Sequence, residues 1–474
     1  MELWVFNYML IMDDVKLCEN DQNNNCKVMD EKKNRNFKEK VFVVRDSVLT
    51  KEFNSSGRIL YNYFASLFIL LAIGTWIRDT WQHGNPLHHT WLIWWNFNRF
   101  PITMLAWGTM HLSTIIFIYY GMTFWSLIPS KNCTFQSQKL YLFSYITYLI
   151  CLFYLPIKWS MWMKLNPACS YIITCENTRL AMKVHSFVRE NFLTGVRRKK
   201  QIFDSRNSVV DGWPTLRQFN YFMFAPTFIY QNEYPRYPTR SWKVVGNYLF
   251  QCFACIYVVN LIFIQQVYPY FSEMNYQENS IMTLIYAIFP SILPGMICLM
   301  MLFYGILHCW LNMFAEALQF GDRLFYDHWW KSRNMAQYYR DWNLVVHEWL
   351  YAYVYRDLST FLKDSFKMDK KGRKISQTLV FFLSAFFHEY WFGISLRVFY
   401  PIMFFLYFVC GGVFFIVSRL IKKDSIWNIA MFCNLLIGTG MFVACYSMEW
   451  YAKDRCLSKG EGFWDWVPKQ WTCQ

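Results

Sequence analysis

Two polar residues stand inside an otherwise apolar stretch, LVFFLSAFFHEYWFG at 379–393: His388 and Glu389. An ionisable group at membrane depth is costly and generally faces a cavity, a partner or a pathway. Burial disfavours the charged form of an imidazole, so such a histidine is held neutral and able to accept a proton. His388 is therefore a candidate general base. The competing interpretation is a core histidine whose hydrogen bonds are satisfied.

Ser384 precedes His388 by four residues, so both lie on one face of a helix. A hydroxyl beside an imidazole is the arrangement of a Ser–His nucleophile. A serine in a membrane helix more commonly bonds the carbonyl one turn back, and this second interpretation is favoured.

Asn343 and His347 are also four residues apart, in the aromatic stretch DWNLVVHEWLYAYVYRD at 341–357. An amide can donate a hydrogen bond, and an imidazole can donate or accept one, so the pair is equipped to polarise a carbonyl or orient a base. The stretch predicts a helix at or near the membrane surface. Polar side chains that only pack helices together would give the same pattern.

The third unusual stretch is FYDHWWK at 325–331. Aromatic rings beside basic residues suit a ligand with a planar ring and phosphates, because rings stack and cations pair with phosphate. An aromatic belt at the membrane interface explains the same composition.

Long charge-free intervals place these residues in a membrane protein, since about 20 apolar residues span a bilayer. The chain has 474 residues, 55% hydrophobic and 21% aromatic. The intervals without Asp, Glu, Lys or Arg are 59–77, 100–130, 140–157, 244–272, 279–315, 398–418 and 425–448. Weaker segments around 159–175 and 376–396 bring the expectation to about nine crossings. The predicted fold is all-α and polytopic.

The net charge of +15 does not indicate nucleic acid, because the basic residues cluster at the ends of membrane segments. The clusters lie at 27–58, 176–206 and 319–374. If these are cytosolic, nine crossings put the N-terminus in the cytosol and the C-terminus in the lumen. Residues 1–50 are predicted to be a mobile cytosolic extension, and 51–474 the membrane domain.

Cysteine and histidine spacing gives little support for a metal site. No zinc-binding pattern, glycine-rich phosphate loop or G-x-S-x-G turn occurs in the sequence. Cys456 and Cys473 bracket a polar tail assigned to the oxidising lumen, and this predicts a disulfide between them.

The order of several segments resembles the sterol O-acyltransferases of the membrane-bound O-acyltransferase superfamily. The resemblance covers roughly residues 41–474. The segments that carry it are VFVVRDSVLT (41–50), MKVHSFVREN (182–191), YFMFAPTFIYQNEYPRYPT (221–239), SILPG (291–295), HCWLNMFAEALQFGDRLFY (308–326), YYRDWNLVVHEWLYAYVYRD (338–357), SAFFHEY (384–390) and EWYA…WTC (449–473).

The resemblance implies roles for individual residues. His388 matches the catalytic histidine, and Asn343 and His347 match the adjacent conserved element. The positions it associates with acyl-CoA are Phe325, Tyr326, Trp329, Trp330, Arg340, Trp342, Tyr355, Arg373, Lys374 and Ser384. The family's FYxDWWN motif reads FYDHWWK here, so His328 replaces its Asp and Lys331 its final Asn.

The implied activity is transfer of a long-chain acyl group from acyl-CoA, a substrate rather than a cofactor, to a sterol hydroxyl. The implied architecture is a catalytic chamber enclosed by membrane helices in the endoplasmic reticulum, in a dimer or tetramer. Three alternatives stand beside it: diacylglycerol acyltransfer, a catalytically weak sterol-binding or sensor protein suggested by His328 and Lys331, and a transporter.

Overall fold

The computed structural model describes residues 39–55, 57–129, 135–204, 212–274, 281–421, 423–455 and 468–469. Within these ranges the chain is helical, and the only β-type pairings are two isolated bridges, Arg45 with Asp322 and Arg236 with Phe320. The all-α prediction is confirmed.

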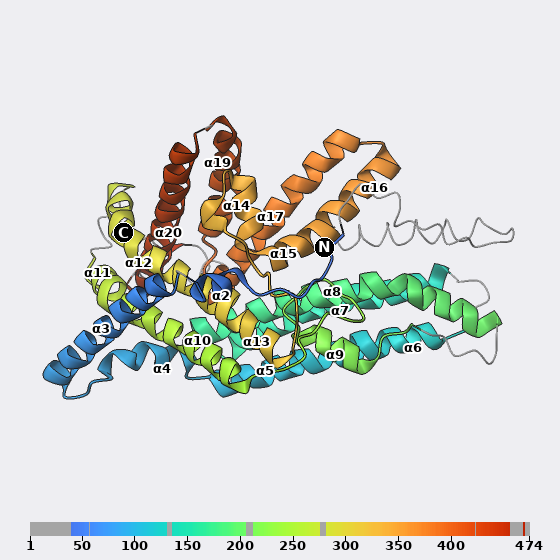
Figure 1. Ribbon diagram of the computed structural model, residues 1–474, viewed down its shortest axis with the longest axis horizontal. Helices are drawn as coiled ribbons and strands as arrows, with labels where there is room; N and C mark the ends of the chain where they lie inside the picture. Colours follow the sequence, from blue (N-terminus) through green and yellow to red (C-terminus); the bar gives the residue numbers. More distant parts are fainter. Residues whose placement is uncertain are drawn as a thin grey trace.

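The first half of the chain forms the helices in the lower part of Figure 1. They are α2 (Val48–Phe53), α3 (Arg58–His83), α4 (Trp91–Phe97), α5 (Phe100–Ser113), α6 (Gly121–Leu127), α7 (Phe135–Trp162), α8 (Pro167–Asp204), α9 (Leu216–Phe224) and α10 (Trp242–Ile262). The π-helical turn η3 (Thr114–Tyr120) joins α5 to α6.

The second half carries the stretches with candidate chemistry. Its helices are α11 (Tyr268–Ser272), α12 (Ile281–Leu302), α13 (Leu311–Ala317), α14 (Met335–Trp342), α15 (Leu344–Trp349), α16 (Asp357–Phe366), α17 (Asp369–Leu396), α18 (Ile402–Phe404), α19 (Gly411–Val417) and α20 (Asp424–Arg455). The π-helical segments are η4 (Phe263–Val267), η5 (Phe303–Trp310), η7 (Leu350–Arg356) and η8 (Phe405–Cys410). Short 3₁₀ turns are η2 (His88–Thr90), η6 (Trp329–Lys331) and η9 (Ser418–Leu420).

Eight helical segments among the described residues are long and apolar enough to cross a membrane, by length and composition. They are Arg58–His83, His88–Leu127, Ser137–Trp162, Trp242–Ser272, Met282–Ala317, Asp369–Leu396, Ile402–Leu420 and Asp424–Lys453. The expected crossing near 159–175 is not among them, because α7 ends at Trp162 and the long α8 that follows carries charges such as Glu176, Arg179 and Lys183. The predicted lumenal C-terminus required an odd number of crossings. The candidate spans of the described residues do not fix the orientation, so the lumenal C-terminus stays a prediction.

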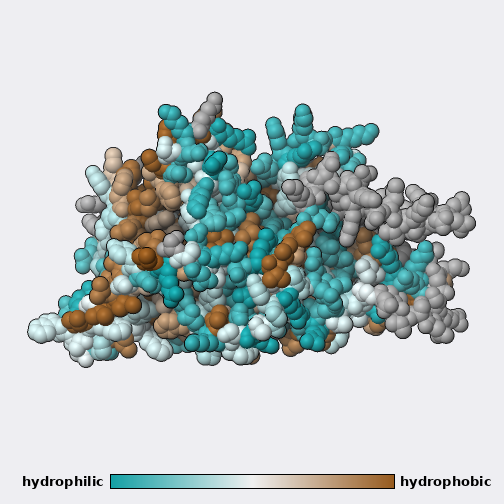
Figure 2. All heavy atoms as spheres, viewed as in Figure 1, coloured by the Kyte–Doolittle hydropathy of each residue, from teal (hydrophilic) through white to brown (hydrophobic). Residues whose placement is uncertain are grey.

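The visible surface is mixed in character. Figure 2 shows apolar side chains gathered at the left, where Figure 1 places α11 and α12, and hydrophilic side chains at the top, where α16 turns into α17. That turn includes the basic run at 370–374.

Two regions assigned from the sequence fall partly or wholly outside the described residues. Residues 1–38 of the predicted extension do so, whereas 39–50 lie against the membrane domain through contacts such as the Arg45–Asp322 bridge. Cys456 and Cys473 are also outside. The ten described cysteines are free thiols, and the predicted disulfide has no support.

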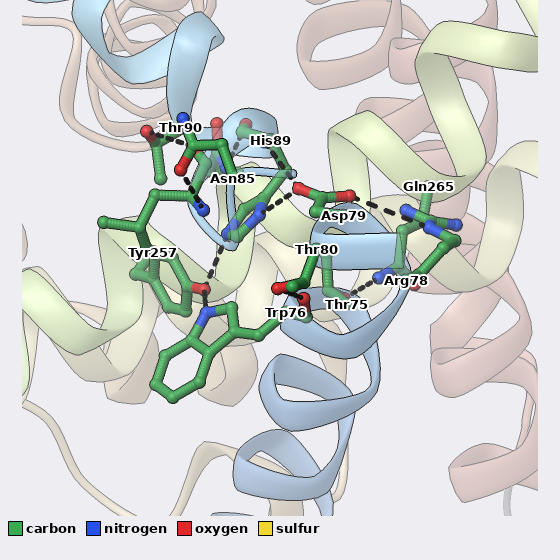
Figure 3. A network of polar contacts seen from close by, with 12 residues as sticks. Thr75, Trp76, Arg78, Asp79, Thr80, Asn85, His89, Thr90, Tyr257 and Gln265 are labelled. Carbon is green, nitrogen blue, oxygen red and sulfur yellow. Dashed lines mark hydrogen bonds and ion pairs between the residues drawn. The ribbon is translucent and has the colours of Figure 1, made fainter. Parts of the chain in front are cut away.

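A polar network holds α3 against α10, although α3 is mostly exposed (Figure 3). Asp79 accepts hydrogen bonds from the backbone N–H and ring Nδ1–H of His89, at 2.8 and 2.7 Å. Tyr257 donates to Nε2 of His89 at 2.7 Å, and its oxygen accepts from Trp76 Nε1–H at 2.6 Å. The ring nitrogens of a buried histidine are thus satisfied inside the protein, as an apolar environment requires.

The close packing of α12 against α20 depends on small residues. A Cβ on Gly440 would lie 2.8 Å from Ile292 Cγ1 and 2.9 Å from the carbonyl oxygen of Ile288. A Cβ on Gly438, two residues earlier in α20, would meet nothing within 4 Å. The two glycines therefore form a matched pair with different surroundings.

We expect Gly440→Val to destabilise the protein by about 1–3 kcal/mol through overpacking, and Gly438→Val to have a much smaller effect. The thermal midpoint of the detergent-solubilised protein measures the difference. Equal losses for both variants would indicate that helix propensity, and not the α12–α20 contact, decides the outcome.

Candidate functional site

His388 lies in α17 with its ring held on two sides. Its Nδ1 is 2.6 Å from the carbonyl oxygen of Ser384. The ring stacks on Tyr407 of η8, with centroids 4.2 Å apart and planes 22° apart, and also contacts Trp391. A carbonyl oxygen can only accept, so Nδ1 carries the proton and, in the neutral ring, Nε2 carries the lone pair. This neutral tautomer is the one a general base requires.

Ser384 acts on His388 through its backbone and not through its hydroxyl. The interpretation as a Ser–His nucleophile has no supporting hydrogen bond.

Glu389, the other ionisable residue of the apolar stretch, has a separate role. Its carboxylate accepts hydrogen bonds from Tyr446 O–H and Phe404 N–H, each at 3.1 Å. On the opposite side of α17, Trp391 donates to Thr178 of α8 at 3.0 Å. These contacts fix the helical turn that carries His388.

Asn343 sits at a break between two helices. It ends α14 and caps α15, with extended φ −147° and ψ 88°, and its Oδ1 accepts from Val346 N–H at 3.2 Å. The cap satisfies one free donor of the first turn of α15. The structure therefore gives Asn343 a defined position one turn before His347, whose N–H donates to the Asn343 carbonyl at 3.0 Å.

The loop FYDHWWK forms backbone hydrogen bonds with the residues on either side of Asn343. Leu344 N–H donates to the carbonyl of Phe325 at 2.9 Å, and Asp327 N–H donates to the carbonyl of Asp341 at 2.8 Å. The two backbone hydrogen bonds lie immediately after and shortly before Asn343. The loop thus positions the backbone of Asn343.

The aromatic residues of that loop are mostly core. Phe325, Tyr326 and Trp329 are 1%, 0% and 4% exposed, so little of their surface is open to a ligand. Trp329 packs edge-on against Phe303 and Trp342. Trp330 and Trp342 are partly buried against the same core. An acyl-CoA contact for these five residues remains a prediction, while their packing supports the loop.

His308 is a residue near the site to which the sequence assigned no role. Tyr326 O–H lies 2.7 Å from His308 Nδ1 and donates to it, and Asn312 and Ser47 approach the same nitrogen at 3.3 and 3.5 Å. The sequence drew attention to Tyr326 as part of FYDHWWK. Nothing in the residue spacing predicted that Tyr326 would contact His308.

A row of stacked rings leads away from His347. Its ring is near-parallel to that of Tyr351, which stacks on Tyr355 at 5.6 Å. Tyr355 is an electrostatic neighbour of Arg373, an exposed residue at the start of α17 that pairs with Asp369 at 2.8 Å. The row therefore connects the helix after Asn343 with the exposed basic end of α17, where Lys374 is also exposed.

The elements bearing Asn343 and His388 pack on each other. Tyr339 of α14 contacts Phe381 of α17 edge-on at 5.2 Å. Tyr407, which stacks on His388, is also an electrostatic neighbour of Tyr339. From Phe381 to His388 is about 10 Å along the helix axis. The structure thus brings the α14–α15 break and the imidazole to adjoining elements.

Comparison with known protein families gives a match over most of the chain. The model of the membrane-bound O-acyltransferase family matches residues 64–448, most of the chain.

The chain belongs to the membrane-bound O-acyltransferase family.

Sterol O-acyltransferases are among the relatives of this membrane-bound O-acyltransferase. Mouse sterol O-acyltransferase 1 is 38% identical over 439 residues, which is 92% of this chain and 79% of the relative. Rat sterol O-acyltransferase 2 is 33% identical over 438 residues, 92% of this chain and 81% of the relative.

The altered motif of this acyltransferase makes a local charge cluster. Asp327 Oδ1 accepts from the backbone N–H of His328 at 2.7 Å and from its Nδ1–H at 2.8 Å. Burial raises the pKa of Asp327, but the hydrogen bonds from His328 and the charge of Arg340 outweigh it and lower the pKa below its ordinary 3.8. Asp327 is therefore ionised at neutral pH, and Lys331 is exposed.

His347 is neutral near pH 7, because burial, followed by the charge of Arg340, lowers its pKa from 6.5 to about 4. Arg340 itself is half exposed and pairs with Asp341 at 2.8 Å. A neutral His347 can donate through one ring nitrogen and accept through the other.

The lowered pKa of His347 predicts acid lability. The stabilising effect is complete above pH 6.5 and is lost as the pH falls from 6.5 towards about 4, because the unfolded chain binds the proton first. We expect the thermal midpoint of the wild type to fall over this range more steeply than that of His347→Gln. The exposed His83 provides the control His83→Gln, which should follow the wild type. Parallel curves for all three proteins would contradict the assignment.

Proposed function

We propose that the chain transfers a long-chain acyl group from acyl-CoA to the hydroxyl of a sterol. The observation that carries the proposal is the half-buried imidazole of His388, whose Nδ1–H is held by a carbonyl, in a chain whose relatives over 92% of its length are sterol O-acyltransferases. The geometry supports acyl transfer, and the relatives support the choice of sterol as acceptor.

His388 acts as the general base. Nε2 takes the proton of the sterol hydroxyl as the oxygen attacks the thioester carbon, and the C–S bond breaks as the C–O ester bond forms. The departing CoA thiolate then receives the proton, so imidazole returns to its neutral form. General-base assistance of this kind contributes about 10² to 10⁴ in rate.

Asn343 and His347 act on the carbonyl side of the reaction. The Oδ1 atom of Asn343 caps α15. The amide N–H₂ of Asn343 is therefore left to donate to the reacting groups or to the negative charge that develops on the thioester oxygen. His347 supports this position from one turn away. Removing one such donor commonly costs about 10²- to 10³-fold in kcat.

The acyl-CoA approaches from the exposed basic side. Arg373, Lys374 and Arg340 supply cations for phosphates, and Tyr355 continues the row of rings from His347. Phe325, Tyr326, Trp329, Trp330 and Trp342 support the loop beside Asn343, and Ser384 holds the base. The apolar surroundings of His388 exclude water, which favours transfer over hydrolysis of the thioester.

The sterol enters from the bilayer, and the apolar ester returns to it. Binding both substrates beside one base converts a bimolecular encounter into a reaction within a complex, worth several kcal/mol of the barrier when the geometry is right. The proposed setting is the endoplasmic reticulum membrane, with the N-terminus cytosolic and the C-terminus lumenal, in a dimer or tetramer of this chain.

The experiment uses microsomes from cells that lack their own sterol and diacylglycerol acyltransferases. With labelled oleoyl-CoA and cholesterol, the wild type should form sterol ester, and His388→Ala should lose about 10²-fold or more. Diacylglycerol is supplied in parallel. Triacylglycerol in place of sterol ester would assign the other acceptor, and sterol binding without any ester from the folded protein would contradict the proposed activity.

The backbone contact to His388 predicts a contrast at Ser384. Because the carbonyl and not the hydroxyl holds the imidazole, Ser384→Ala should lower kcat far less than His388→Ala, although its KM for acyl-CoA can change. Initial rates at varied oleoyl-CoA separate the two parameters. An equal loss of kcat in both variants would favour a serine nucleophile.

A further inference from the structure

The segment of residues 39–53, here called the strap, contacts the chain around FYDHWWK and the helix α15 that follows Asn343. Its middle is paired with the chain before FYDHWWK: Arg45 N–H donates to the carbonyl of Gly321 at 2.9 Å, and Arg323 N–H donates to the carbonyl of Arg45 at 3.0 Å. The Arg45 side chain also forms a two-point ion pair with Asp322, at 2.5 and 3.1 Å. The middle of the strap is therefore held against residues 321–323 by both backbone and side-chain contacts.

One end of the strap reaches the helix that carries His347. Lys40 Nζ lies 2.6 Å from Glu348 Oε1 and 3.4 Å from Asp322 Oδ2. The side chains of Lys40, Glu348 and Asp322 are 14%, 23% and 1% exposed, so the pairs are partly or fully shielded from water. Burial raises the pKa of Glu348, and Lys40 and Arg45 of the strap act against that rise.

The other end of the strap reaches the altered position of the motif. His328 Nε2 lies 3.4 Å from Glu52 Oε1 of α2, while Nδ1 of the same ring is held by Asp327. The groups facing this imidazole are thus two carboxylates and the ring of Trp330, with Arg340 acting on Asp327 from α14. One of the two residues that depart from the family motif, His328, thus contacts the strap.

Both ends therefore act on the same short stretch. Glu348 follows His347 directly, and His328 follows Asp327, whose N–H bonds the Asp341 carbonyl before Asn343. We propose that the strap is a positioning element of the active site, which holds Asn343 and His347 in place through the Lys40–Glu348 and Glu52–His328 contacts. Residues of the strap are positioning residues, since none of them is placed among the reacting groups. The inference rests on the proposed function only for its kinetic consequence.

The test is a charge-exchange cycle on the full chain at the buried end of the strap. Lys40→Glu places an anion beside Glu348 and Asp322, Glu348→Lys places a cation beside Lys40, and the double variant restores an opposite pair. Glu52→Gln tests the other end. The control is Asp424→Lys, which breaks an exposed pair between α20 and Arg333 at 4.0 Å that involves no residue of the strap.

Two readouts are taken on each variant. The first is kcat and KM for oleoyl-CoA in sterol ester formation. Lys40→Glu should lower kcat about three- to tenfold with little change in KM, because positioning of Asn343 matters most in the transition state. Glu52→Gln should lower kcat about two- to threefold, since that contact is more exposed. The double variant should recover part of the loss and stay above Lys40→Glu, because the opposite pair with position 348 returns while the new carboxylate at position 40 still lies beside Asp322.

The second readout is hydrogen–deuterium exchange of the peptide covering 341–348. Lys40→Glu should raise its exchange, the double variant should reverse part of the rise, and Asp424→Lys should leave it unchanged. Unchanged exchange in Lys40→Glu, or losses in the two single variants that simply add in the double, would overturn the proposal. If the wild type forms no sterol ester, the proposed function fails, and exchange alone then decides whether the strap holds 341–348.

Discussion

The arrangement of the site depends on two backbone hydrogen bonds that interrupt a helix at Asn343. Nothing in the sequence DWNLVVH at 341–347 breaks a helix, because it contains neither proline nor glycine. In a continuous helix Leu344 N–H would bond the Arg340 carbonyl, and the Asp341 carbonyl would accept from Val345. Instead, the loop at 325–327 bonds both the Leu344 N–H and the Asp341 carbonyl. Two hydrogen bonds within a helix are thus replaced by two hydrogen bonds between distant segments. The burial of Phe325 and Tyr326 fixes the loop that makes the exchange.

Local spacing was sufficient to propose candidate catalytic residues but not to predict the contacts that support them. The apolar surroundings of His388 and the i, i+4 relation of Asn343 and His347 were legible because both depend on residues close in sequence. The all-helical class followed from charge-free intervals of the right length. The crossing expected near 159–175 is not among the eight candidate spans of the described residues, because hydropathy alone does not register that α7 ends at Trp162.

Contacts between distant residues were not predictable from one sequence. From the sequence, Glu389 was grouped with its neighbour His388 as a pair of ionisable residues. In the structure the carboxylate of Glu389 instead accepts hydrogen bonds from Tyr446 and Phe404, which lie in later segments. The aromatic residues of FYDHWWK suggested a ligand surface, whereas most of Phe325, Tyr326 and Trp329 is enclosed by the protein. Composition alone does not separate a ring that faces a ligand from one that faces another ring.

The hydrogen bond from His388 to Ser384 has a consequence for the direction of proton movement. With Nδ1–H committed to a carbonyl, the imidazole has a single nitrogen that exchanges protons. It cannot accept on one edge and release on the other, as a relay histidine does. In the proposed reaction the sterol oxygen and the CoA sulfur must therefore meet the same edge of the ring in turn, and the proton that leaves the alcohol is returned along the path by which it came. The proposed reaction therefore has the imidazole accept and return the proton through Nε2 alone, and it requires both substrates to be bound at the same time.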